Sequence, residues 1–395
     1  MTDPRVLLFT GKGGVGKSTL CSASAVAAAD LGLRTLVIST DPAHSVADVF
    51  GIDASGGGPL PVSDNLDVLQ LDSRMLLERS WRSVQEYLLK VLDTAGIGNV
   101  AAEELTVLPG AEEVLALLEV RNYVRSGDYD LIALDCAPTA ETLRLLSLPE
   151  ALDWYMRKIW PVERKVVTAL RSPLTRTTGV PMPGSDVLDA VERLHDDLAE
   201  VRSVLTAPGS AVRLVFTPDA VVLAEARRTL TSLALFGYRV DAGIANRIFP
   251  AGADEWRSGW AEAQAERLQQ ARQDIAPLPV LTAPYRSQEP VGVAELRELA
   301  GEVYPDQDPL GLPEAEPPLQ LERLGEQIVV VLRLPLAVKG DVDLAERNAE
   351  LIVTVGGYRR VLALPSALQR HQVVGAGLAD GVLRVRFLPK DQVRS

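Results

Sequence analysis

The sequence predicts an α/β protein: a mostly parallel, doubly wound sheet with a helical subdomain, followed by a small all-β sandwich. Two observations lead to this prediction. Over the first 300 residues, short apolar runs alternate with helical stretches. Beyond a proline-rich stretch, the runs become short and β-branched and are punctuated by Gly and Pro.

The first unit of the chain is a βαβ unit. Residues 6–10 and 35–39 are near-continuous apolar runs, and the stretch between them, residues 18–32, is rich in small helix-forming residues. Further apolar runs, each separated by a helical pattern, lie at residues 66–71, 131–135, 212–216 and 243–246. Apolar strands in this alternation predict a parallel sheet that is covered on both faces.

Two stretches, about residues 74–125 and 150–205, are longer than a simple crossover needs and carry apolar residues at helical spacing. We expect them to form a helical subdomain above the sheet. This subdomain is predicted to carry an apolar groove that receives a helix of another protein, which we call the client. The residues predicted to line the groove are Trp81, Leu88, Trp154, Met156 and Trp160. Packing of these residues into the core is the alternative, because apolar stripes on helices usually face inward.

Three segments follow from composition. Residues 1–304 form the α/β domain, and residues 305–319 are rich in proline and acidic residues, which predicts an extended linker that few contacts cross. Residues 320–395 contain the β-branched runs 327–334, 350–355, 360–363 and 382–387. This last segment is expected to fold as a small all-β domain.

Composition also excludes several classes of protein. The formal net charge of −13 opposes binding to nucleic acid or to an anionic membrane surface, so membrane contact is expected only through a client or receptor. The two cysteines, Cys21 and Cys136, form no CxxC, so no disulfide framework and no thiolate zinc site is expected. No apolar run approaches the roughly 20 residues that a membrane-spanning helix needs. These features favour a cytoplasmic protein.

A phosphate-binding loop lies directly between the first strand and the first helix. Residues 11–18, GKGGVGKS, match G-x-x-x-x-G-K-[ST] in this context. Lys17 is predicted to reach the β and γ phosphates, and the Ser18 hydroxyl is predicted to reach Mg²⁺. The predicted nucleotide-binding residues of the loop are Gly11, Gly13, Gly14, Val15, Gly16, Lys17, Ser18 and Thr19.

The loop contains a second lysine, Lys12. Its side chain is predicted to act on the nucleotide of a second subunit, where it would supply the charge that an arginine finger supplies elsewhere. A solvated lysine without a role is the alternative. The hypothesis implies a homodimer.

Acidic and hydroxyl residues follow two of the predicted strands, at the edge where ligands of open α/β sheets bind. Asp41 is predicted to orient the attacking water and accept its proton, and His44 and Ser45 are predicted to move with the γ-phosphate. A helix cap is the alternative for this segment. Asp135, which ends an apolar strand, is predicted to hold the water shell of Mg²⁺.

The doubled-lysine loop, together with STDPAHSVADVFG, LDCAPTAETLRLLSLPE and IANRIFP, resembles the arsenite-pump ATPase family, whose eukaryotic members target tail-anchored membrane proteins. The resemblance covers roughly residues 5–300 and implies ATP and Mg²⁺ bound at a homodimer interface. It implies catalytic roles for Lys12, Lys17 and Asp41. It also assigns Pro138 and Thr139 to a second switch, a segment that changes conformation with the bound nucleotide. Asn246, Pro284 and Tyr285 are assigned to the part of the site that contacts the adenine ring. The guanine-reading N-K-x-D pattern is absent, which favours ATP.

The sequence departs from this family at three points. Residues 140–142, Ala-Glu-Thr, stand where the second switch usually continues Gly-His-Thr. The interfacial zinc CxxC is missing, so no zinc is expected at a dimer interface. The cysteines that bind arsenite are missing too. Residues 321–389 resemble an α-crystallin-like (small heat-shock) domain without the distal I-x-I tail.

These features predict a homodimeric, Mg²⁺-dependent ATPase that switches a helical surface for hydrophobic protein segments. Two alternatives remain open at this point. One is a holdase chaperone in which ATP is a structural ligand with little turnover. The other is a subunit of an arsenite pump, which the cysteine count disfavours.

Overall fold

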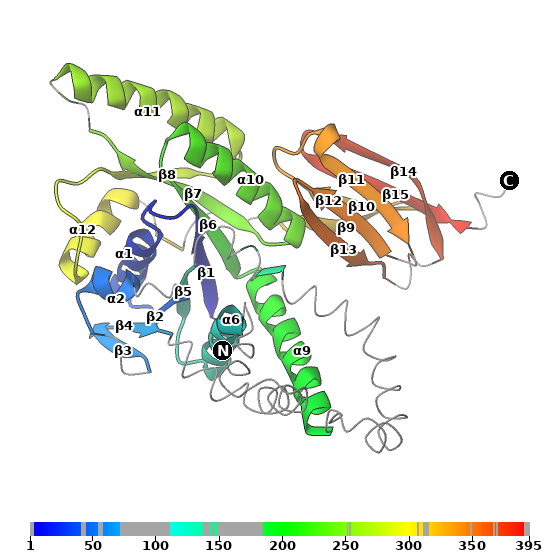
Figure 1. The fold of residues 1–395 in the computed structure, drawn as a ribbon, viewed down its shortest axis with the longest axis horizontal. Coiled ribbons are helices and arrows are strands. Elements are labelled where there is room, and N and C mark those ends of the chain that lie inside the picture. Colours follow the sequence, from blue (N-terminus) through cyan, green and yellow to red (C-terminus); the bar gives the residue numbers. More distant parts are fainter. Residues whose placement is uncertain are drawn as a thin grey trace, which may run out of the picture.

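The computed structural model describes two β-containing domains (Figure 1). The described residues are 4–40, 45–53, 58–71, 111–136, 143, 146–147, 185–250, 252, 254–305, 308–310, 316–347, 350–365, 368 and 370–390.

The first domain is built on an eight-stranded sheet with the strand order β3-β4-β2-β5-β1-β6-β7-β8. All neighbours are parallel except β3 and β4, which pair antiparallel at one edge. The strands are β1 (Arg5–Thr10), β2 (Thr35–Ser39), β3 (Leu60–Ser63), β4 (Leu66–Gln70), β5 (Leu131–Asp135), β6 (Ser210–Phe216), β7 (Val240–Ile248) and β8 (Val280–Pro284).

Helices cover both faces of this sheet (Figure 1). One face packs against α1 (Lys17–Asp30), α2 (Ser45–Phe50) and α12 (Val293–Val303). The other face packs against α6 (Ala111–Ser126), α9 (Ser185–Thr206), α10 (Ala220–Phe236) and α11 (Glu255–Asp274).

The apolar run of β1 shows why the sheet is central. Alternate side chains of a strand point to opposite faces, so Val6 and Leu8 enter one core layer while Leu7 and Phe9 enter the other. All four residues are buried. The prediction of a doubly wound, mostly parallel sheet is confirmed.

The sequence analysis missed the two edge strands, β3 and β8. Strand β3 has the sequence LPVS and is partly exposed, and β8 has the sequence VLTAP with only Ala283 buried. Edge strands bury fewer side chains and tolerate proline. Neither strand therefore carries the apolar run that marks the central strands.

Helices α6 and α9 are the described parts of the two predicted helical inserts. Leu117 of α6 and Leu198 of α9 are buried in the same core layer. Arg121 of α6 forms an ion pair with Asp197 of α9, and Arg125 lies 2.5 Å from Glu200. The two helices are thus joined to each other and to the sheet.

Five residues were predicted to line a client groove: Trp81, Leu88, Trp154, Met156 and Trp160. All of them lie outside the described residues, so the groove stays a prediction. No helix in the described part of the chain is long and apolar enough to cross a membrane.

The second domain is an antiparallel β-sandwich. Its sheets have the strand orders β14-β15-β10-β9 and β11-β12-β13. The strands are β9 (Leu319–Leu324), β10 (Gln327–Arg333), β11 (Val342–Arg347), β12 (Glu350–Val355), β13 (Tyr358–Ala363), β14 (His371–Ala379) and β15 (Val382–Pro389). The predicted all-β domain is confirmed as a fold class. Strands β9, β11 and β14 were missed. None of their side chains is buried, and their apolar residues are interrupted by polar residues or glycine.

The two domains pack together through α10 (Figure 1). Leu235 of α10 is fully buried within the apolar core of the sandwich. The Thr231 hydroxyl donates to the carbonyl of Pro335, and the Arg360 guanidinium donates to the carbonyl of Leu235. Helix α10 therefore belongs to the cores of both domains.

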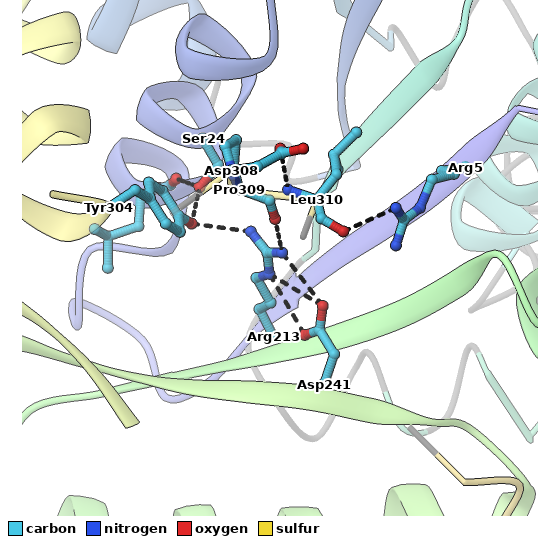
Figure 2. A network of polar contacts seen from close by, with 9 residues as sticks. Arg5, Ser24, Arg213, Asp241, Tyr304, Asp308, Pro309 and Leu310 are labelled. Atoms are coloured by element: carbon cyan, nitrogen blue, oxygen red, sulfur yellow. Dashed lines mark hydrogen bonds and ion pairs between the residues drawn. The ribbon is translucent and has the colours of Figure 1, made fainter. Parts of the chain in front are cut away.

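A buried arginine ties the beginning of the predicted linker to the first domain (Figure 2). The Arg213 side chain on β6 is fully buried and forms an ion pair with Asp241 on β7 at 3.2 Å. Its guanidinium donates to the Tyr304 hydroxyl at 2.9 Å and to the carbonyl of Pro309.

The neighbouring residue extends this attachment. Leu310 is buried in the core beside α12, and its carbonyl accepts a hydrogen bond of 2.8 Å from Arg5. The expectation that few contacts cross the stretch 305–319 is therefore wrong for residues 308–310. The reason is that the buried guanidinium needs acceptors, which this backbone supplies.

Asp241→Asn tests the importance of the Arg213 ion pair. Removing one partner of a buried pair leaves the other charge uncompensated, so we expect the free energy of unfolding to fall by about 3 kcal/mol. Glu295→Gln is the matched control, because Glu295 pairs with Arg286 at the surface. It should cost less than about 1 kcal/mol. Urea denaturation measures both, and equal stability of the two variants would contradict the prediction.

Truncation tests the attachment of residues 303–310. A chain that ends at Leu310 keeps Val303, Tyr304 and Leu310 in the core, whereas a chain that ends at Glu302 loses all three. We expect the shorter chain to melt several degrees lower, since each buried apolar side chain contributes about 1.5–3 kcal/mol. Calorimetry of the two chains measures the difference, and identical values of Tm would show that the segment is dispensable.

Candidate functional site

The phosphate-binding loop connects β1 to α1 at the carboxyl edge of the sheet. Helix α1 begins at Lys17, and Gly16 precedes it with φ +94°. The exposed Gly13 and Gly14 form the rim of the loop, and the buried Lys17 side chain donates to the carbonyl of Lys12 at 3.4 Å. This arrangement directs backbone N–H groups and one ammonium group toward the place where phosphate binds.

Close approach of the backbone explains two of the glycines. A Cβ on Gly11 would lie 2.0 Å from the backbone carbonyl oxygen of Val215 in β6. A Cβ on Gly16 would lie 2.2 Å from Nδ2 of Asn246, which itself donates to the carbonyl of Val15 at 2.8 Å. The loop therefore packs against the backbone of β6 at a distance that only glycine permits, and it also contacts the Asn246 side chain of β7.

A line of hydroxyl and carboxylate groups lies beside the loop. The Ser18 hydroxyl donates to Ser45 Oγ at 2.9 Å, and the Ser45 hydroxyl donates to Asp135 Oδ2 at 3.3 Å. Asp135 is fully buried at the end of β5, and its carbonyl accepts from the Thr40 amide at 3.0 Å. Hydroxyl and carboxylate oxygens of this kind fit Mg²⁺ and its water shell.

Lys12 points away from this line. Its ammonium lies 4.0 Å from Glu225 Oε2 on α10, and its side chain is 40% exposed. The sequence analysis did not single out Glu225, since an isolated glutamate in a helix carries no signal of such a role. The second loop lysine thus faces the surface and the helix that carries the second domain.

The residues expected on the adenine side come together next to the loop. Asn246, Pro284 and Tyr285 line a cavity of about 380 Å³ together with Gly16 and Thr19. Parallel strands β7 and β8 end at the same edge as β1, which is why residues so far apart in the sequence meet there. Arg286 also borders the cavity and was not predicted.

Four predicted residues lie outside the described part of the chain. Asp41 and His44 belong to the DPAHS segment, residues 41–45, which is the first predicted switch, and Pro138 and Thr139 belong to the second. Their roles stay predictions. The described residues that flank them, Thr40, Ser45 and Asp135, lie at the site.

The two cysteines are buried in opposite core layers. Cys21 lies with α1 on one side of the sheet and Cys136 on the other side. Burial raises the pKa of the Cys21 thiol well above its usual value, and the Asp135 carboxylate raises it further. The same two causes raise the pKa of Cys136. In the described part of the chain, no cluster of three or more His, Cys, Asp or Glu residues could hold a metal ion.

The fold and the site together define the class: this is a P-loop nucleotide-binding protein on a doubly wound sheet. The family model described as "Anion-transporting ATPase" matches residues 4–305, and the model "HSP20-like domain found in ArsA" matches residues 325–387. The chain belongs to this ATPase family. The resemblance drawn from the sequence motifs is confirmed for both domains.

Curated relatives agree with this assignment. A "Putative arsenical pump-driving ATPase" of Chlorobaculum tepidum is 37% identical over 388 residues, which cover 97% of this chain and 96% of the relative. A protein of Aquifex aeolicus named "Putative arsenical pump-driving ATPase 1" is 33% identical and covers 92% of this chain and 95% of its own. "ATPase GET3B" of Arabidopsis thaliana is 30% identical over 77% of this chain and 79% of its own.

The environment of the cysteines predicts their reactivity. Because the pKa of each thiol is raised and both are buried, the thiolate population at pH 8 is very small, and neither sulfur meets solvent. We expect iodoacetamide to leave both cysteines unmodified in the native protein and to modify both in urea. Mass spectrometry counts the adducts, and rapid native labelling at pH 8 would contradict the prediction.

Proposed function

We propose that this protein hydrolyses ATP in a Mg²⁺-dependent reaction as a homodimer, and that its nucleotide state switches a helical surface for hydrophobic protein segments. The observation that carries the proposal is the line of contacts from Ser18 through Ser45 to Asp135 beside a complete phosphate-binding loop. These contacts join the loop to Ser45 of the predicted first switch and to β5, the strand that ends at Asp135.

The chain's own residues divide the work as follows. Backbone N–H groups of the loop and the Lys17 ammonium bind the phosphates. Ser18 and Asp135 would hold Mg²⁺ and its waters, and the ion would neutralise charge on the phosphates. Asp41 is the proposed acceptor of the proton from the attacking water.

The homodimer is supported by the position of Lys12. The side chain is partly exposed, and its ammonium pairs with a carboxylate of its own chain, Glu225 on α10. A partner's phosphates would offer this ammonium a stronger counter-charge than a half-exposed glutamate does. We therefore assign Lys12 the role of a group that acts across the dimer.

Coupling of the nucleotide to the helical surface is supported by the chain that leaves Asp135. Leu143 and Leu146 are buried in the same core layer as α6 and α9, and the carbonyl of Leu146 accepts a hydrogen bond of 2.7 Å from Tyr238. A movement of the second switch would therefore reach the layer from which the helical inserts extend.

Arsenite is disfavoured as the ligand that drives turnover. Arsenite chemistry needs accessible thiolates, and the chain's only two cysteines are both fully buried. The name "arsenical pump-driving ATPase" describes the relatives and does not assign arsenite to this chain. For this chain, hydrophobic protein segments are the better proposal, and arsenite should not stimulate its ATPase activity.

A mixing experiment tests the shared active site. Lys12→Ala and Asp41→Asn should each abolish ATP hydrolysis, since a charge supplied across subunits is worth about 10³ to 10⁵ in rate. An equal mixture should recover about a quarter of the wild-type rate, because half of the random dimers are hybrids with one intact composite site. Release of phosphate from ATP and Mg²⁺ is the measurement.

The control is Lys339→Ala, which removes an exposed lysine of the second domain and should leave the rate unchanged. Full activity of Lys12→Ala alone would refute the role across subunits. Tight binding of ATP without turnover by the wild-type protein would instead favour the holdase alternative.

A further inference from the structure

A cavity of about 630 Å³ lies between the two domains, and we call it the interdomain cavity. One wall is the part of α10 from Ala224 to Ser232, and α10 lies against the sandwich (Figure 1). The sandwich forms the other wall, through the loop after β10 and the turn between β12 and β13. Cavities of this size at domain interfaces are typical of binding sites. The interdomain cavity is separate from the nucleotide cavity, which β7, β8 and the phosphate-binding loop line.

The sandwich wall of the interdomain cavity is mainly apolar. Its residues are Leu336, Ala337, Asp341, Val355, Gly356 and Tyr358. Leu336 is 39% exposed and has φ +65°, a left-handed backbone conformation that bulky side chains rarely adopt. Strained backbone of this kind clusters at binding sites, where it positions a side chain. The strain therefore marks Leu336 as a residue that contacts a ligand.

The α10 wall is polar. The hydroxyl groups of Thr229, Thr231 and Ser232 each donate to the carbonyl four residues earlier in the helix. A hydroxyl has one proton and two lone pairs, so these groups offer a ligand acceptors and no further donor. A ligand that carries N–H groups fits this wall better than a hydrocarbon chain, which would bury the hydroxyls without giving them a partner.

Charge is balanced across the interdomain cavity. Two of the four charged residues that line it, Glu225 and Arg227, are already in ion pairs. The other two are exposed and come from different domains, Arg228 from α10 and Asp341 from the sandwich. A strongly charged ligand of either sign would meet a like charge here. An extended peptide backbone carries both C=O and N–H groups, so it has an acceptor for Arg228 and a donor for Asp341.

The length of the α10 wall fits a short stretch of extended chain. From Ala224 to Ser232 the helix rises about 12 Å, at about 1.5 Å per residue. An extended chain covers this length with about four residues, at about 3.3 Å each. Alternate side chains of such a chain point to opposite sides. A segment with apolar residues at every second position would thus match a cavity with one apolar wall.

We propose that the interdomain cavity binds a short extended segment of another protein that has apolar side chains at alternate positions. The sandwich supplies the apolar contact through Leu336, and α10 supplies hydroxyl acceptors and the Arg228 guanidinium. The site is distinct from the helical surface of the proposed function, and binding to it does not require ATP.

Leu336→Asn tests the proposal in the full chain. Asn tolerates the left-handed conformation, so the variant should melt at the wild-type temperature or above it. The probe is a fluorescein-labelled hexapeptide of alternating Leu and Ser residues, and fluorescence anisotropy without nucleotide measures its affinity. We expect saturable binding to the wild-type protein. Binding to Leu336→Asn should be at least about tenfold weaker, because an apolar contact is lost while the fold is kept.

The matched control is Leu324→Asn, which changes a sandwich residue that is 61% exposed and does not line the interdomain cavity. It should leave the affinity for the hexapeptide unchanged. Arg228→Gln is a second variant, on the opposite wall. It removes the charge and keeps a residue that favours helix, and it should weaken binding several-fold.

Three outcomes would overturn the proposal. One is the lack of saturable binding to the wild-type protein below about 1 mM hexapeptide. Another is equal affinity of the wild-type protein and Leu336→Asn, which would place the peptide elsewhere. The third is a cavity that binds a fluorescent fatty acid in a Leu336-dependent manner but not the hexapeptide. Because the assay contains no nucleotide, each of these outcomes leaves the proposed ATP hydrolysis standing, and absence of hydrolysis would leave the peptide site standing.

Discussion

A single buried charge organises much of the first domain. Arg213 lies in the middle of an apolar strand, and its guanidinium cannot remain unpaired away from water. Asp241 neutralises it from the next strand, the Tyr304 hydroxyl accepts from it, and the carbonyl of Pro309 closes the site (Figure 2). Tyr304 in turn hydrogen-bonds Ser24 of α1 at 2.7 Å. The helix that begins at the phosphate-binding loop is thereby tied to the segment that leads into the second domain.

A second constraint acts at the carboxyl edge of the sheet, beside the phosphate-binding loop, where backbone packs closely against backbone. The loop can approach β6 only because Gly11 has no Cβ. On the other side of the loop, the Ser18 hydroxyl donates to Ser45, and the Ser45 hydroxyl donates to Asp135. The same three hydroxyl and carboxylate groups fit Mg²⁺ and lie next to both segments that are predicted to switch, so binding and switching would share one set of contacts.

Helix α10 connects this edge with the β-sandwich. Its first half carries Glu225, which lies beside Lys12, and its last turns carry Thr231 and Leu235, which pack on the second domain. A helix moves as a rigid element over this length. If Lys12 leaves Glu225 for a partner's phosphates, as proposed above, the change would occur on the helix to which the sandwich is attached. This arrangement would give the second domain a physical route to the nucleotide site.

The sequence by itself determined the central strands, the loop and the family, because these depend on local patterns: apolar runs such as residues 131–135 and a glycine-lysine motif between a strand and a helix. Tertiary structure decided which distant residues meet. The pairing of Arg213 with the backbone of Pro309, the position of Lys12 at Glu225 and the clustering of Trp256 with Tyr285 all join segments with no shared local signal. Such contacts arise from the strand order and from helix packing, and neither is encoded in the pattern of any one segment.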